Sequence, residues 1–140
     1  MTDQPTATST VAGLAPLARD LGPAAPKPTA LTDGVLEAAD SLWAVPGVDV
    51  GYWECSPGRF SATREGYTEV CQFLSGRVTI EVDGEAPVTF GAGDTLVTPS
   101  GWRGVWDVHE TVRKLYVIID DAPSAAGTCL LYTSPSPRDS

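Results

Sequence analysis

The hydrophobic positions of this chain recur at the two-residue period of a β-strand. The run RVTIEV at 77–82 alternates cleanly, with Val78, Ile80 and Val82 on one face. Similar short runs predict strands at 48–55, 59–63, 68–74, 77–82, 87–90, 95–98, 102–108 and 112–120. No helical periodicity separates these runs, so the pattern predicts an all-β domain.

Turn residues punctuate these runs at regular intervals. They are SPG at 56–58, EG at 65–66, SG at 75–76, DG at 83–84, GAGD at 91–94 and PSG at 99–101. Asp83 and Gly84 suit a tight hairpin because both residue types tolerate positive φ. Short strands with this spacing predict an antiparallel sandwich or barrel, and closure into a barrel removes exposed edges.

The two ends of the chain do not follow the strand pattern. Residues 1–30 are rich in Pro, Ala and Thr, and we expect a disordered or mobile N-terminal arm, with packing on a partner subunit as the alternative. Residues 31–46 form a transition, in which 35–42 fits either a short helix or an irregular edge strand. The barrel domain is predicted over 31–122 and a disordered tail over 123–140.

Composition and charge narrow the function classes. Nine Lys and Arg against 18 Asp and Glu give a net charge of −9, and the cations are scattered, which argues against nucleic acid as a partner. No apolar run is long enough to span a bilayer. The N-terminus lacks a basic region followed by an apolar one, so we expect a cytoplasmic protein without a membrane partner.

The segment CLLYTSPSPRDS at 129–140 differs from the rest of the chain. It resembles the in-frame translation of a sequencing-library adapter, and a genuine disordered tail is the alternative. We leave it out of the fold argument in either case. The three cysteines, Cys55, Cys71 and Cys129, are widely spaced without a CxxC pair, so neither a disulfide framework nor a zinc knuckle is predicted.

Two spaced motifs resemble those of cupins. Gly93, Pro99 and Gly101 match the spacing of the second cupin motif, and Glu69 and Gly76 match the end of the first. Together with WECSPGRF at 53–60 and VRKLY at 112–116, the pattern resembles small single-domain cupins of the (S)-ureidoglycine aminohydrolase-like branch. The resemblance covers residues 48–119 and implies an antiparallel jelly-roll β-barrel of the RmlC-like cupin type.

The histidines that cupins use as metal ligands are missing from this frame. The first motif would place two of them within 64–67 or slightly earlier, and the second would place one at Gly104. His109 is the single histidine in the sequence. We therefore predict no metal cofactor, although a divalent ion on a carboxylate-based site with Glu54 and Glu69 stays open as an alternative.

Glu69 and Lys114 are the candidate catalytic residues. In the cupin frame Glu69 points into the barrel, where a carboxylate must be paired or hydrogen-bonded. Lys114 lies on the same strand face as Tyr116, with Arg113 on the other face. A lysine near Glu69 could bind a carboxylate or serve in acid–base chemistry. A structural Lys–Glu ion pair that joins two strands is the alternative.

Five further residues are candidates for ligand binding. Glu54 could be the counterpart of Glu69, or it could cap the turn at 56–58. Arg59 could reach the pocket mouth, and Trp106 could wall the pocket or fill the core. Tyr116 could carry its hydroxyl at the rim. Gln72 stands where histidine is frequent in the group that the chain resembles.

Three functions are compatible with these residues. The first is a cupin that binds a small polar or nitrogen-containing metabolite in its barrel, with acid–base catalysis as an extension. The second is a non-catalytic ligand-sensing or accessory module, with a homodimer as one option. The third is a metal-dependent cupin enzyme with a carboxylate-based site. Because one fold hosts many chemistries, the resemblance predicts the fold more sharply than the activity.

Overall fold

The computed structural model describes residues 9–122 of the chain and contains strands without helices in that range. The strands are β1 (Ala25–Pro26), β2 (Leu36–Val45), β3 (Val48–Cys55), β4 (Gly58–Thr63), β5 (Tyr67–Glu81), β6 (Val88–Gly91), β7 (Thr95–Thr98) and β8 (Arg103–Asp120). The all-β prediction is confirmed. Within this part of the chain there is no helix that could cross a bilayer.

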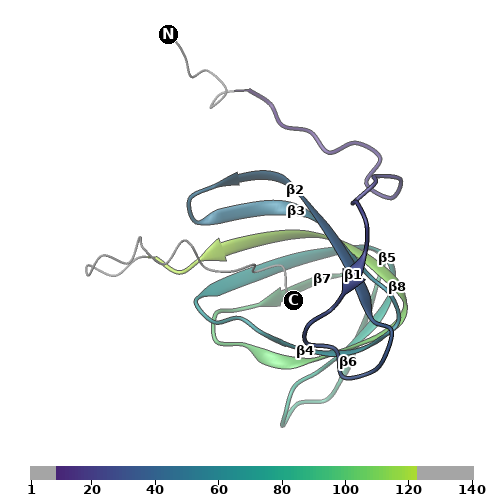
Figure 1. Ribbon diagram of the computed structural model, residues 1–140. Coiled ribbons are helices and arrows are strands. Elements are labelled where there is room, and N and C mark those ends of the chain that lie inside the picture. Colours follow the sequence, from purple (N-terminus) through teal and green to yellow (C-terminus); the bar gives the residue numbers. More distant parts are fainter. Residues whose placement is uncertain (1–8, 123–140) are drawn as a thin grey trace.

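Two long strands, β5 and β8, form the spine of the barrel (Figure 1). They pair antiparallel from Tyr67↔Asp120 to Glu81↔Val105. The other edge of β8 pairs with β3 through its later half and with β4 through its earlier half. The other edge of β5 pairs with β7 and then with β6. Each long strand thereby serves both walls of the barrel, and all these pairs are antiparallel.

The β5–β8 pair bends near its middle, so that its two halves belong to different walls of the barrel. The register between β5 and β8 shifts around Phe73, Ser75 and Arg77. Gly76 lies at this bend with φ of 87°, and a Cβ there would collide with the carbonyl of Thr111. The sequence predicted a strand break at this glycine. The structure instead has one bulged strand, because the residues on both sides continue to pair with β8.

Strand β8 joins two runs that the sequence analysis separated. The predicted strands 102–108 and 112–120 are one strand, because the polar residues between them still lie in the β5–β8 ladder, as with Arg77↔Glu110. All of the undecided segment 35–42 except Val35 belongs to β2, which pairs with β3 with a shift between Ser41 and Trp43.

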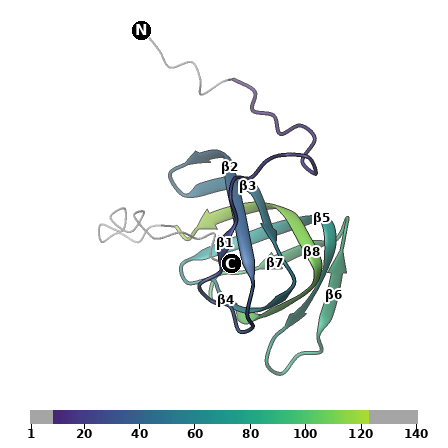
Figure 2. The ribbon, with the colours of Figure 1, turned by 45° about the vertical axis from the view of Figure 1, so that its right-hand side comes forward.

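Part of the predicted N-terminal arm packs on the barrel. Figures 1 and 2 show this segment approaching β1 from the side of β2 and β3. Strand β1 lies within residues 1–30 and pairs with β2, and Lys27 is buried. Arg113 on β8 donates to the carbonyls of Pro16 and Arg19 at 2.7 and 2.8 Å. Residues 1–8 and the predicted tail 123–140, with its adapter-like end, lie outside the described residues.

The centre of the barrel is aromatic. Trp53, Phe60, Phe73 and Trp106 come from β3, β4, β5 and β8 and are each at most 1% exposed. Trp106 stacks on Phe60 with ring centroids 5.6 Å apart and contacts Trp53 edge to face at 5.8 Å. Because the four rings reach inward from both walls, they fix the space in which the interior polar residues lie.

Candidate functional site

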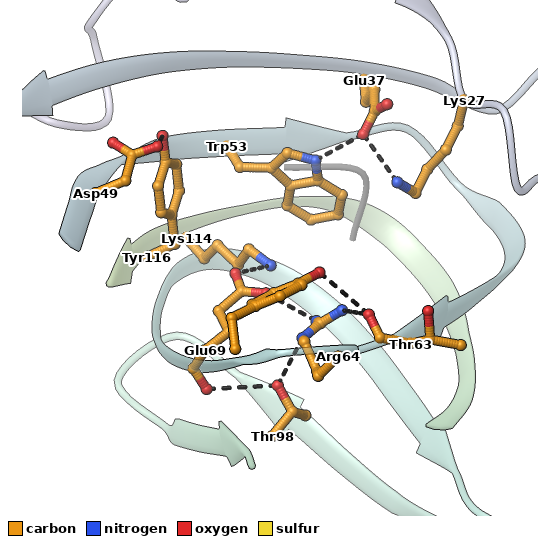
Figure 3. A network of polar contacts seen from close by, with 11 residues as sticks. Lys27, Glu37, Asp49, Trp53, Thr63, Arg64, Glu69, Thr98, Lys114 and Tyr116 are labelled. Atoms are coloured by element: carbon orange, nitrogen blue, oxygen red, sulfur yellow. Dashed lines mark hydrogen bonds and ion pairs between the residues drawn. The ribbon is translucent and has the colours of Figure 1, made fainter. Parts of the chain in front are cut away.

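The barrel interior holds a buried cluster of three charged side chains, Arg64, Glu69 and Lys114 (Figure 3). The Lys114 ammonium Nζ is 2.8 Å from Glu69 Oε2, and Arg64 Nη2 is 2.8 Å from Glu69 Oε1. Each of the three residues is at most 1% exposed. The two candidate catalytic residues therefore come together, because both face inward from the neighbouring strands β5 and β8.

Arg64 was not among the residues that the sequence analysis selected. It lies in the turn between β4 and β5 and places its guanidinium inside the barrel. Its Nε donates to Thr98 Oγ1 at 2.9 Å, and its Nη1 donates to the carbonyl of Thr63 at 3.1 Å. The Tyr67 and Trp102 rings lie 5.8 and 5.6 Å from its Cζ. This dense set of partners holds the guanidinium in one place.

Aromatic faces enclose Lys114. Its Nζ is 4.3 Å from the centroid of the Trp53 ring and 4.4 Å from that of Trp106. These are cation–π contacts, which stabilise an ammonium in a dry environment. The indole Nε1 of Trp106 is buried and finds no hydrogen-bond acceptor among residues 9–122. Trp106 thus contributes both an aromatic wall and a donor that the described protein groups leave unused.

A second interior ion pair lies at the end of the barrel that β1 covers. Lys27 Nζ is 2.9 Å from Glu37 Oε1, which also accepts from the Trp53 indole Nε1 at 2.9 Å (Figure 3). The ammonium also lies 4.6 Å from the Phe60 ring centroid. Burial lowers the pKa of Lys27, while the Glu37 carboxylate opposes that shift. Sequence reasoning missed Lys27 because the segment before it reads as an arm.

Tyr116 also faces inward, and the two described cysteines are inert there. The Tyr116 hydroxyl donates to Asp49 Oδ2 at 3.3 Å. Burial raises the pKa of both Cys55 and Cys71 to about 12. Because the nucleophile is the thiolate, neither thiol is suited to covalent catalysis at neutral pH.

Three of the selected ligand-binding residues lie away from this cluster. Glu54 alternates with Trp53 on β3, so it faces outward, where its Oε1 is 2.8 Å from Arg113 Nη2. Gln72 faces outward between two buried neighbours and contacts the 91–95 turn, donating to the carbonyl of Gly93 at 2.9 Å. Arg59 pairs with Glu81 at 2.9 Å on the surface. Strand parity separates these three residues from Glu69, so the expected convergence of Glu54 on Glu69 does not occur.

Known proteins share this architecture. Residues 47–116, half of the chain, match the model of the EutQ-like cupin domain, so the protein is a cupin and belongs to that family. None of the curated proteins matches the sequence.

Solved structures share the fold. The EutQ protein of Clostridium difficile aligns with a TM-score of 0.55 and 22% identity over 61% of this chain and 69% of its own. A Rhizobium leguminosarum protein of unknown function gives 0.54 and 26% over 60% and 81%. A Pseudomonas syringae protein of the DUF861 family, also of unknown function, gives 0.59 and 19% over 69% and 42%. These similarities confirm the cupin fold.

The donor set in the barrel does not fit the metal ion that cupins commonly hold. Arg64 lies at the start of the segment 64–67, where the first cupin motif has histidines. It pairs with Glu69, the carboxylate that the same motif uses as a metal ligand. At Gly104, a side chain would collide with the Trp102 ring, 2.5 Å from the place of its Cβ. Among residues 9–122, no three His, Cys, Asp or Glu side chains gather in a way that could hold an ion. A guanidinium repels the cation that imidazoles would bind.

Proposed function

We propose that this protein is a cupin that binds a small polar metabolite in its barrel without a resident metal ion. The observation that carries the proposal is the Arg64–Glu69 ion pair, because it places a permanent cation where the cupin frame has metal ligands. A guanidinium is charged at all physiological pH values and donates in fixed directions. It can attract and orient a polar ligand as an ion would, but it cannot activate a bound water as a Lewis acid does.

Binding rather than acid–base catalysis is the role that we favour for Glu69 and Lys114. The two groups are 2.8 Å apart, which is close enough for proton exchange. However, each oxygen of Glu69 already lies beside a cation, Arg64 on one side and Lys114 on the other. A substrate proton would have to compete with these two cations for the carboxylate. Lys114 has three N–H donors, so it can hold Glu69 and still contact a ligand.

Metal analysis combined with a ligand screen tests this proposal. Protein purified without chelator should carry no stoichiometric manganese, iron, nickel or zinc, and adding these ions should leave its melting temperature unchanged. A thermal-shift screen of ureides, amino acids and small organic acids should find a ligand, with about 2.7 kcal/mol of stabilisation at a hundredfold excess over Kd. The ureides are included because of the resemblance to the ureidoglycine aminohydrolase-like branch.

Two results would contradict the proposal. One is an equimolar metal that stabilises the protein and is lost in Glu69→Gln but retained in Glu54→Gln, the matched carboxylate on the outer face. The other is a screen in which no compound raises the melting temperature. The second result would favour an accessory module without a small ligand.

A further inference from the structure

We infer that the ligand is a small monocarboxylate held by Lys114 Nζ and Trp106 Nε1. The inference rests on the proposed function and specifies its ligand class. Both groups belong to β8, and both side chains are buried in the barrel. The reasons are the charge balance of the interior, the unused indole donor and the apolar walls around them.

The charge balance of the buried residues is uneven. The structure describes four buried cations, Lys27, Arg64, Arg113 and Lys114. Lys27 pairs with Glu37, and Arg113 pairs with Glu54. Arg64 and Lys114 share the single carboxylate of Glu69. This cluster therefore carries one positive charge in excess, in a place where an uncompensated charge is strongly unfavourable. A ligand with one negative charge balances it.

The two donors belong to side chains that are in contact. The Lys114 ammonium lies 4.4 Å from the centroid of the Trp106 ring, and the indole N–H is at the edge of that ring. Trp106 Nε1 is fully buried without an acceptor among the described residues. A carboxylate presents two oxygens, so one can accept from the ammonium and the other from the indole. Hydrogen bonds between an ammonium and a carboxylate are among the strong ones in proteins.

The surroundings limit the ligand to a short, singly charged acid. Trp53, Phe60 and Phe73 all pack against the Trp106 ring, and each is at most 1% exposed. These rings favour an apolar tail over a second polar group. A phosphate or a dicarboxylate would bring two negative charges against an excess of one. The charge match and the walls together select monocarboxylates with a small hydrocarbon tail.

Calorimetric titration with matched acids and amides tests the inference. The probes are formate, acetate, propionate and butyrate, and their amides have nearly the same shape without the charge. We expect the acids to bind, the amides to bind at least about tenfold more weakly, and phosphate and malonate to bind more weakly than the best monocarboxylate.

Two variants assign the binding to the named atoms. Lys114→Met should weaken acid binding by at least about tenfold, and it leaves Arg64 and Glu69 as a balanced pair. Trp106→Phe removes the N–H and keeps an aromatic ring, so it should weaken binding severalfold even if Lys114→Met does not fold. Arg77→Met, which removes an exposed cation paired with Glu110, is the control and should bind the acids unchanged.

The outcomes separate this inference from the proposed function. If ureides or other neutral compounds bind and the acids do not, the carboxylate inference is wrong while the binding function stands. If the acids bind equally to wild type and both interior variants, they bind elsewhere and the inference is also wrong. If neither acids nor neutral compounds bind, both proposals fail.

Discussion

Two carboxylate–cation pairs that share strand β8 have opposite surroundings. Glu54 and Arg113 are register partners on β3 and β8. The next position, Trp53↔Lys114, points to the other side of the sheet and leads to Glu69. The outer pair is partly exposed, with 38% of the Glu54 side chain accessible, whereas Glu69 and Lys114 are each 1% exposed. A shift of one residue along the strand thus separates a surface contact from an interior one.

The partners of each pair show what the difference means. Arg113 also donates to the carbonyls of Pro16 and Arg19, so the outer pair fastens the N-terminal segment to the sheet. The inner pair contacts Arg64 and two tryptophan rings inside the barrel. A carboxylate–cation pair holds the N-terminal segment on the outer face of the sheet, and a second such pair makes the interior charged. Environment, rather than residue type, decides which of the two can serve a ligand.

Removing the inner carboxylate should have the largest effect. Glu69→Gln leaves Arg64 and Lys114 as two neighbouring buried cations without an anion. We expect it to lower the free energy of unfolding by about 3–5 kcal/mol, measured by urea denaturation. The double variant Glu69→Gln with Lys114→Met should recover part of that loss, because it removes one of the two uncompensated charges.

The outer pair supplies the control for this measurement. Glu54→Gln changes the same functional group on the opposite face of the sheet. If Glu69→Gln and Glu54→Gln lower the free energy of unfolding equally, the inner cluster is not a buried set of charges, and the contrast between the two faces is wrong.

The interior should also respond to alkaline pH through Cys71. Burial raises the pKa of this thiol to about 12, against 9.0 for the free group. Between these values the unfolded chain loses the proton while the folded chain keeps it. The contribution of Cys71 to stability is therefore fully present below pH 9.0 and is lost as the pH rises toward about 12. Above the lower value the slope is about 1.4 kcal/mol per pH unit.

Comparison with Cys71→Ala isolates this slope. The variant has a constant packing defect, so the difference in unfolding free energy between wild type and variant should be flat below pH 9.0 and should shrink above it. A difference that stays constant up to pH 11 would mean that the thiol is accessible to solvent. Urea denaturation at each pH provides the measurement.

The sequence predicted the fold well because the strand signal is local. Alternating residues and turn pairs depend on near neighbours, and the spacing of Glu69, Gly93 and Pro99 adds the cupin frame. The same alternation correctly placed Lys114 and Tyr116 on one face and Arg113 on the other. It failed at Gly76 and around Glu110, where long-range pairing in the β5–β8 ladder continues strands through turn-like or polar residues.

The sequence predicted two of the interior charged residues, Glu69 and Lys114, but not Arg64 and Lys27. Arg64 lies in a turn and Lys27 beside a two-residue strand, so no periodicity reports where their side chains point. Their places follow from contacts with Glu69, on the strand that follows Arg64, and with Glu37, in the undecided segment 35–42. Glu54 was an avoidable error, because strict alternation already sets it opposite its buried neighbour Trp53. In the sequence, the absence of histidines from the cupin motifs was the only sign that Arg64, rather than a metal ion, lies beside Glu69.

The smallest effect is expected at the outer pair. Glu54→Gln removes a partly exposed charge, but Arg113 keeps its bonds to Pro16 and Arg19. We expect a loss of about 1 kcal/mol or less in the free energy of unfolding, because solvent screens such a pair. Binding of a monocarboxylate should not change, since Glu54 lies on the other face of the sheet. Calorimetry on this variant sharpens the comparison: weaker acid binding would mean that the two faces are coupled through β3 and β8.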